Sequence, residues 1–357
     1  MGPIPLRAED TFNNIGYSLL KLILAFTTYY WIRIFYFRRM KIITANAKIS
    51  WVLLLTLALL NQCKPKSDDT AVNAIPKELN ISLAQWSIHN ALDSGVLKAE
   101  NFASIAKNDF GISAIEYVSQ FYKEQALDQN FWKGMKATAD SLGVKSLLIM
   151  IDEEGDLGNP DPEARKKAVE NHFKWIDAAA ILGCHSVRIN AFGDGSKEEV
   201  QTAMVDALTQ LCAYSQKVNI NVLIENHGLY TSDASWVAEI IQRVNMPNCG
   251  TLPDFGNWCT SKKWGGIEAG DCEVMYDPYQ GVSEMLPFAR GVSAKSYAFN
   301  EQGEEKFIDY GKMLKMVKDS DFSGYIGIEY EGKPGTETDG IKATKALIEK
   351  SWQKVNQ

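Results

Sequence analysis

The chain has 357 residues, 46% of them apolar, and a formal net charge of −7 at pH 7. This length suits one α/β barrel of roughly 250 residues with added segments, or two average domains. The acidic balance argues against a nucleic-acid partner, because such partners require a basic surface.

The first 63 residues differ from the rest of the chain in their apolar character. The range 17–37 is long enough to span a membrane, which takes about 20 apolar residues. The range 49–60 follows basic residues and precedes Cys63, an order typical of a secretory signal. We expect Met40 to be the natural start, and the protein to be membrane-anchored at an extracytoplasmic location of a bacterium. The alternative is a true N-terminal membrane helix.

Cys63 precedes a polar segment, residues 64–79, that contains two prolines and is suited to be a tether. This arrangement resembles a lipoprotein processing site. Leu60, three residues before the cysteine, fits that pattern, whereas Gln62 replaces the small residue that normally stands next to it. We expect lipid attachment at Cys63, with a cysteine buried in a short membrane helix as the alternative.

From residue 80 onward, short apolar runs alternate with longer amphipathic stretches. Most of the runs are separated by about 30 to 40 residues, the repeat of a β/α unit. Strands that are buried on both faces read as apolar runs of this kind. We predict a (β/α)8 TIM barrel over residues 80–357. An open doubly wound sheet is the alternative, but the sequence lacks its Gly-rich phosphate loop. The predicted strands are 81–86, 112–118, 146–151, 186–191, 220–224, 250–252, 291–294 and 325–328.

Carboxylates close three of these strands, with Glu225 after the fifth, Asp254 after the sixth and Glu329 after the eighth. In this fold the C-terminal ends of the strands carry the active site, so the three side chains are expected to converge. Three converging like charges cannot all stay ionised without a positive partner. Oxygen ligands suit a divalent cation, which polarises a sugar carbonyl. We predict such an ion here, with Mn, Mg, Zn and Co all open.

Other polar and aromatic residues at or near the strand ends are suited to bind sugar hydroxyls or a sugar ring. Each has a structural alternative, either a salt bridge or core packing. Asp152 and Glu331 also close predicted strands, but we assign them no role. Cys259 and Cys272 share one Gly-rich loop and are expected to form a disulfide in an oxidising compartment. The predicted substrate-binding residues are Trp86, Glu116, Arg188, Asn190, His227, Asn257 and Lys295.

Four segments, 223–227, 252–257, 292–295 and 325–332, carry a family resemblance. Through them the chain from about residue 80 resembles the sugar phosphate isomerase/epimerase family, whose barrel superfamily includes xylose isomerase, tagatose epimerase and endonuclease IV. The resemblance implies that a metal is held by Glu, Asp, His and Glu on strands five to eight. It also implies that the two Glu residues act as acid and base. Glu225, Asp254 and Glu329 match three ligands, and the implied catalytic pair is Glu225 and Glu329.

The chain departs from this pattern on strand seven, where Ser293 stands at the position of the histidine ligand. Asn257 likewise stands where a histidine often follows the Asp of strand six. A site without these histidines is expected to hold the ion through carboxylates and water. Alternatively, Lys295 supplies the positive charge itself.

Three functions remain open on these grounds. The first is a sugar isomerase or epimerase that abstracts a proton next to a carbonyl and passes through an enediolate. The second is a lyase that eliminates a substituent from a 3-keto-glycoside after the same first step. The third is a carbohydrate-binding lipoprotein without catalysis. The expected partners are a small carbohydrate and the membrane, and the sequence leaves open whether the chain forms a homo-oligomer.

Overall fold

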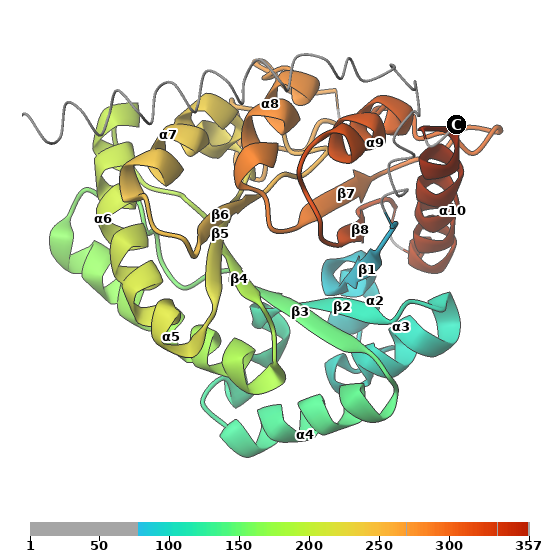
Figure 1. The fold of residues 1–357 in the computed structure, drawn as a ribbon, viewed down its shortest axis with the longest axis horizontal. Helices are drawn as coiled ribbons and strands as arrows, with labels where there is room; N and C mark the ends of the chain where they lie inside the picture. Colours follow the sequence, from blue (N-terminus) through green and yellow to red (C-terminus); the bar gives the residue numbers. More distant parts are fainter. Residues whose placement is uncertain (1–77, 269, 334, 356–357) are drawn as a thin grey trace, which may run out of the picture. The chain divides into compact units, whose positions relative to one another are not determined.

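The computed structural model describes residues 78–268, 270–333 and 335–355, so the predictions for the signal, Cys63 and nearly all of the tether lie outside it. Its eight parallel strands follow the order β6-β5-β4-β3-β2-β1-β8-β7 in one curled sheet (Figure 1). Every predicted strand is present, which confirms an α/β barrel. The strands are β1 Ile81–Ala84, β2 Ala114–Val118, β3 Lys145–Met150, β4 Ser186–Ile189, β5 Asn221–Glu225, β6 Cys249–Leu252, β7 Val292–Ser296 and β8 Ile326–Tyr330.

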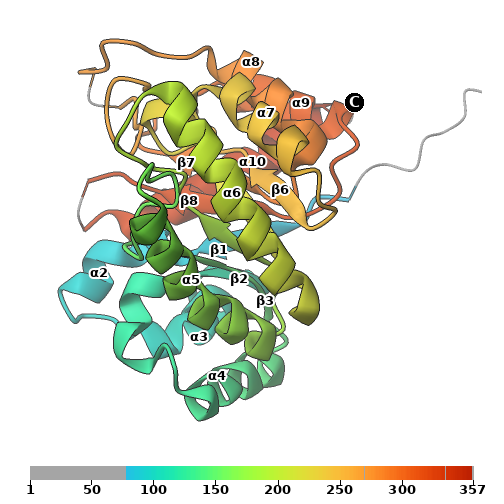
Figure 2. The same ribbon diagram turned by 90° about the vertical axis from the view of Figure 1, so that its left-hand side faces the viewer.

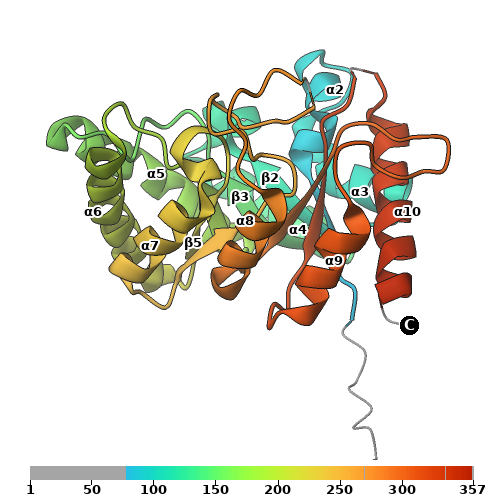
Figure 3. The same cartoon turned by 90° about the horizontal axis from the view of Figure 1, so that it is seen from above.

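A helix follows each strand and covers the outside of the sheet, with α5 packed beside α6 (Figure 2) and α9 beside α10 (Figure 3). No helix among the described residues has both the length and the apolar character needed to cross a membrane. The helices are α2 His89–Asp93, α3 Phe102–Phe110, α4 Gln129–Ser141, α5 Pro162–Leu182, α6 Lys197–Ser215, α7 Ala234–Val244, α8 Pro278–Met285, α9 Tyr310–Asp319 and α10 Glu337–Val355. Short 3-10 helices cover Gln85–Ile88, Ala99–Asn101, Ser119–Gln125, Gln216–Val218, Leu229–Ser232 and Leu286–Phe288.

Local sequence explains where the long helices begin and end. The Asp161 side chain accepts a hydrogen bond from the Ala164 amide at the start of α5, and Gly183 ends that helix in the left-handed conformation. At the start of α6, Ser196 and Glu199 form a reciprocal capping box. These caps satisfy amides that would otherwise lack partners in the first helical turn.

The barrel closes between β6 and β7 through single backbone contacts rather than a regular ladder. The Arg290 amide donates to the carbonyl of Thr251, and the Ser293 amide donates to that of Pro253. The Phe255 amide in turn donates to the carbonyl of Ser293 at 3.0 Å. This closure places Asp254, which lies just beyond the end of β6, directly beside Ser293.

The interior of the barrel combines an apolar layer with a polar one. A small cluster of buried side chains fills the apolar layer, and it is separate from the larger core between strands and helices. Because side chains alternate along a strand, Leu223 and Glu225 of β5 point into the same interior, one layer apart. The apolar cluster consists of Ala84, Val118, Leu148, Met150, Leu223 and Leu252.

Candidate functional site

Three carboxylates meet at the C-terminal ends of the strands. Glu225 ends β5, Asp254 follows β6 and Glu329 lies in β8. One oxygen from each lies within 4.8 Å of the others, and all three residues are buried. The structure thus brings together the three residues that the sequence predicted to share one site. We call them the carboxylate triad.

The hydroxyl of Ser293 joins two members of the triad. Its Oγ lies 2.5 Å from Oδ2 of Asp254 and 2.9 Å from Oε2 of Glu329. A hydroxyl has one proton, so it donates to one carboxylate only, and the second contact requires a proton on a carboxyl group. Burial raises the pKa of Asp254 to about 7, which allows Asp254 to hold that proton.

Lys295 in β7 supplies positive charge beside Glu329. Its Nζ is fully buried and lies 2.9 Å from Oε1 of Glu329 and 3.2 Å from Oε2 of Glu331. Burial alone would raise the pKa of Glu329, but the Lys295 ammonium and its hydrogen bond outweigh burial and hold that pKa below its usual range. Glu329 is therefore ionised at neutral pH.

Glu225 has a different environment. Nε of Arg188 lies 2.8 Å from its Oε2, and Nη1 of the same guanidinium lies 2.7 Å from Oδ1 of Asp152. Neither Glu225 oxygen, however, accepts a hydrogen bond from any residue that the structure describes. Burial raises the pKa of Glu225 well above its usual value, and the neighbouring Glu329 and Asp254 add to that rise against Arg188. Oε1 therefore remains available to another ligand, whereas Oε2 faces Arg188.

The charge balance of this cluster fits a cation. With every carboxyl group ionised, five negative charges face the two positive charges of Arg188 and Lys295. A divalent cation on the triad would remove most of that excess, and carboxylate oxygens are the ligands that hard divalent ions prefer. The donor set and the Oε1 atom of Glu225, which accepts no hydrogen bond from the described residues, therefore fit such an ion. The five carboxyl groups are those of Asp152, Glu225, Asp254, Glu329 and Glu331.

His227, just after β5, is held through a short polar chain. Its Nδ1 lies 2.8 Å from Oδ1 of Asn190, whose Nδ2 donates to Oδ1 of Asp152 at 2.6 Å. Burial, together with the nearby Arg188 charge, lowers the pKa of His227 to about 3, so the imidazole is neutral at pH 7. With Nδ1 donating to Asn190, Nε2 is left as an acceptor.

A cavity of about 450 Å³ opens at this end of the barrel. Glu329 lines it, whereas Glu225 and Asp254 are fully buried and are absent from the lining residues that the structure describes. The predicted substrate-binding residues divide in the same way. Trp86, Arg188 and His227 line the cavity. Glu116, Asn257 and Lys295 are buried and do not line it, and the half-buried Asn190 lines a neighbouring cavity instead, so their proposed contacts with substrate stay predictions.

Several residues of this site received no role from the sequence. Glu331 accepts a hydrogen bond from Nε1 of Trp86. Both Glu331 and Asp152 line the cavity. The signal for Glu331 was its position two residues after Glu329, which places both side chains on one face of β8. Lys263 and Trp264 also line the cavity, but they come from a long irregular loop with no strand pattern to indicate where it folds.

That loop lies between Cys259 and Cys272, which form a disulfide in the structure. The backbone amide of Leu229, just after β5, donates to the carbonyl of Lys262 in the loop at 3.1 Å. The loop is thus joined both to itself and to the segment that carries His227.

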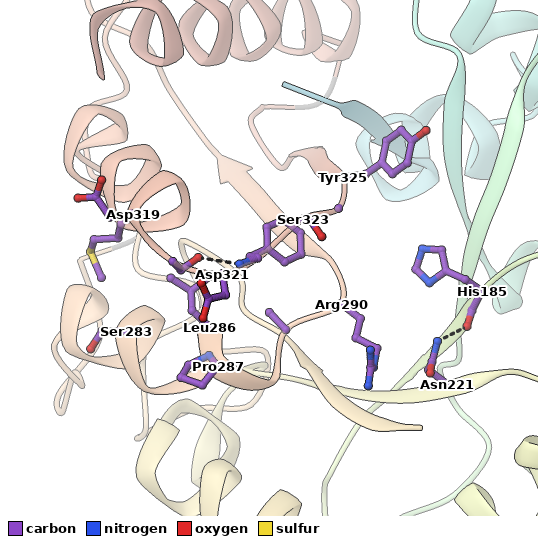
Figure 4. Close-up of a pocket in the computed structure, with 15 residues that line it drawn as sticks. His185, Asn221, Ser283, Leu286, Pro287, Arg290, Asp319, Asp321, Ser323 and Tyr325 are labelled. Carbon is purple, nitrogen blue, oxygen red and sulfur yellow. Dashed lines mark hydrogen bonds between the residues drawn. The ribbon is translucent and has the colours of Figure 1, made fainter. Parts of the chain in front are cut away.

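A larger cavity of about 960 Å³ opens at the other end of the barrel (Figure 4). Its lining includes His185, Asn221 and Tyr325, which precede or begin strands, and the Asn221 side chain donates to the carbonyl of His185. None of the triad lies there. Because conserved chemistry in this fold sits at the C-terminal ends of the strands, the smaller cavity is the candidate site.

Comparisons with known proteins agree with this geometry. A family model described as a xylose isomerase-like TIM barrel matches residues 105–351. A xylose isomerase domain protein from Planctomyces limnophilus superposes with a TM-score of 0.57 at 15% identity, covering 79% of this chain and 99% of that one. A 3-keto-D-glucoside 4-epimerase from E. coli superposes with a TM-score of 0.57 at 12% identity, covering 76% and 100%.

One curated relative also matches, the alpha subunit of a 3'-dehydrocarminate deglycosidase from Microbacterium sp. It is 35% identical over 57 residues, and the match spans 16% of this chain and 16% of that protein. A match of this extent concerns a segment, and it does not extend to the activity of the whole relative.

Proposed function

The chain belongs to the xylose isomerase-like TIM barrel family, and from this membership we propose that it is a carbohydrate isomerase or epimerase. The observation that carries the proposal is the buried carboxylate triad beside the cavity, in which Oε1 of Glu225 has neither a hydrogen bond nor an ion pair among the described residues. Paired carboxyl groups next to a cation site suit the removal and return of a proton on a sugar carbon.

Glu225, Asp254 and Glu329 would hold a divalent ion, whose identity among Mn, Mg, Zn and Co the donor set leaves open. When bound, the ion would polarise a sugar carbonyl and stabilise the negative charge that develops as the neighbouring proton leaves. The oxygen-rich donor set supports this assignment.

Glu329 and Glu225 are our proposed base and acid. Their pKa values are shifted in opposite directions, which is the usual sign of a base and an acid in one site. Glu329 lines the cavity and is kept ionised by Lys295, so it takes the proton from carbon. Glu225 retains a proton and returns it, while His227 offers Nε2 to a sugar hydroxyl.

The proposed substrate is a neutral sugar. Of the cations that line the cavity, Arg188 is paired with two carboxylates and Lys262 with Asp271. The remaining one, Lys263, lies over the aromatic rings of Phe192 and Trp264. A phosphate group would therefore lack the cluster of available cations that its binding requires.

A lyase acting on a 3-keto-glycoside is the second candidate, supported by the deglycosidase name of the curated relative. Elimination begins with the same proton abstraction, so it uses the same base. A carbohydrate-binding protein without catalysis is the third, because Ser293 replaces a ligand that the family pattern implies. Product analysis separates the first two, and proton exchange separates both from the third.

The test is metal analysis of the purified protein, followed by incubation with keto-sugars and 3-keto-glycosides in deuterated water. We expect about one divalent ion per chain, and deuterium on the carbon next to the carbonyl. Asp254→Asn should lose the ion and the exchange, because it removes one ligand of the triad. Glu337→Gln is the matched control, since Glu337 is also buried but lies outside both the triad and the predicted substrate-binding residues, and it should retain the ion and the exchange.

An ion that survives Asp254→Asn would show that the triad is not the metal site. Wild-type protein that binds metal but incorporates no deuterium from any of these sugars would contradict proton abstraction, and would favour the binding protein instead.

We also propose export and lipid attachment at Cys63. The disulfide between Cys259 and Cys272 supports export, because disulfides persist mainly in oxidising compartments. Feeding cells a clickable fatty acid should label the wild type and leave Cys63→Ser unlabelled. An unlabelled wild type in the membrane fraction would refute lipidation alone, whereas recovery from the cytoplasm would refute export as well.

A further inference from the structure

The loop closed by the Cys259–Cys272 disulfide forms one side of the cavity mouth, and we call it the Trp264 loop. Its cavity-lining residues include Lys262, Lys263 and Trp264. Trp264 keeps 45% of its surface exposed, so it is one of the few large apolar side chains that the described barrel leaves open to solvent. An exposed aromatic face inside a cavity indicates a binding surface.

The ring of Trp264 is held in place rather than free. It packs edge-on against His227 at 4.9 Å and against Phe192 at 5.4 Å between ring centroids. Nζ of Lys263 lies 5.1 Å from its centroid. The Trp264 backbone has a φ of 70°, in the left-handed region that non-glycine residues adopt only under strain.

The backbone beneath Trp264 is also fixed. Gly228, at a φ of 96°, approaches the loop so closely that an added Cβ would lie 2.5 Å from the Lys262 carbonyl oxygen and from the Trp264 amide nitrogen. The Cys259 amide donates to the Gly265 carbonyl at 2.8 Å. With the disulfide, these contacts hold Trp264 ready before any ligand arrives, which reduces the entropy lost on binding.

The cavity therefore has two zones of different chemistry. Arg188, Glu329 and Glu331 make the inner wall polar and charged, next to the triad. Trp264 and Lys263 make the rim aromatic and cationic. Groups suited to sugar hydroxyls thus lie in the inner zone, and the exposed ring suited to stacking lies at the rim.

We propose that the rim is a separate subsite for a second ring, so that the substrate is a glycoside rather than a free monosaccharide. This inference rests on the proposed function. The sugar ring that reacts occupies the inner zone, and the ring attached to it, an aryl group or a second sugar, stacks on Trp264. The volume of about 450 Å³ lies within the general range of small-molecule sites.

The test compares one-ring and two-ring probes by titration calorimetry. The probes are methyl β-D-glucoside, phenyl β-D-glucoside and cellobiose, with the galacto and manno counterparts of the first two. We expect at least one two-ring probe to bind wild type about tenfold more tightly than its one-ring counterpart, the scale of an aromatic stack of about 1.5 kcal/mol. The aryl and disaccharide arms show which kind of second ring is preferred.

Trp264→Ala should abolish that preference by weakening two-ring binding more than one-ring binding, while Trp264→Phe should retain most of the preference. Phe307→Ala is the matched control, because Phe307 is 46% exposed but absent from the described cavity lining, and it should bind like wild type.

Equal binding of one-ring and two-ring probes by wild type, including no binding of either, overturns the subsite. A preference that survives Trp264→Ala overturns it too. The calorimetric measurement does not depend on turnover. A negative binding result therefore does not contradict the proposed function, which the exchange test examines separately. Likewise, absence of deuterium exchange does not contradict the subsite.

Discussion

At the scale of single residues, neighbours rather than residue type set the charge state of each buried carboxyl group. Glu329 and Glu116 are both buried inside the barrel. Glu329 contacts the Lys295 ammonium, so its pKa lies below the usual range. Among the described residues, Glu116 accepts a side-chain hydrogen bond from the Ser82 hydroxyl alone, at 2.6 Å. Burial raises the pKa of Glu116 to about 7. One carboxyl group is thus a base at neutral pH, and the other is half protonated.

Glu329→Gln should reduce deuterium exchange about 100-fold, because it removes the base and keeps the shape of the side chain. Glu331→Gln is the comparison, since Glu331 shares both the Lys295 partner and the cavity wall. Exchange measured by NMR at saturating Mn²⁺ should remain within about tenfold of wild type in that variant. Equal losses in the two variants would mean that charge near Lys295, and not a base at Glu329, is what the reaction needs.

Glu116→Gln should change how stability depends on pH. The folded-state pKa of about 7 lies above the usual 4.5, so the folded protein binds the proton more tightly than the unfolded chain. In wild type, Glu116 makes its full contribution to the free energy of unfolding below pH 4.5, and that contribution is lost as the pH rises through 7. Glu116→Gln has no group that titrates at this position, so it does not show this loss. Between pH 5 and pH 8 its free energy of unfolding should therefore increase relative to that of wild type by up to about 3 kcal/mol.

Urea unfolding of wild type and Glu116→Gln at pH 5, 6, 7 and 8 checks this expectation. Glu124→Gln, which changes an exposed carboxylate, should follow wild type at each pH. Parallel curves for wild type and Glu116→Gln would show that Glu116 is ionised throughout this range.

At the scale of elements, strands and loops contribute different parts of the site. The strands place their side chains by alternation, so Gly327, Glu329 and Glu331 share the inner face of β8. Gly327 leaves room for the Glu116 side chain, because a Cβ at this position would lie 2.6 Å from Oε1 of Glu116. The Trp264 loop depends instead on its disulfide and on its contact with Gly228.

Gly228→Ala should destabilise the protein and weaken two-ring binding. The substitution adds strain at positive φ and forces the loop backbone away, because the atoms in its path belong to the backbone. Gly95→Ala is the matched control, with a φ of 72° but nothing within 4 Å of the added Cβ. We expect roughly 1 kcal/mol for Gly95→Ala and at least twice that for Gly228→Ala in chemical unfolding. Equal costs would indicate that the loop moves without strain.

At the scale of the whole molecule, the barrel gathers an excess of negative charge at one end of its strands and covers it with helices and loops. Buried charges of one sign destabilise the folded state unless a partner compensates them. An ion on the triad would then contribute to the stability of the entire barrel, because binding only the folded state shifts the unfolding equilibrium.

Mn²⁺ at about 100 times its dissociation constant should raise the melting temperature by roughly 5 to 10 °C. The same addition should leave Asp254→Asn unchanged, since that variant lacks one ligand. Differential scanning calorimetry with and without EDTA provides the measurement. A shift of equal size in both proteins would place the ion elsewhere on the surface.

The sequence by itself determined the barrel and the composition of its triad. Strands such as β5 and β8 are apolar runs with a carboxylate at the end, and that local pattern is readable because it depends on burial and alternation within one segment. The position of Cys259 and Cys272 in one Gly-rich loop likewise predicted their disulfide, and the structure pairs them.

Only the tertiary structure decided how these groups act on one another. That Ser293 contacts Asp254 depends on the closure between β6 and β7, and that Lys295 and Ser293 contact Glu329 depends on the pairing of β7 with β8. The position of Trp264 depends on contacts with a segment more than 30 residues away. Such contacts join different strands and loops. Local sequence propensity cannot predict them, because their energies arise only when side chains that are distant in the sequence are buried together.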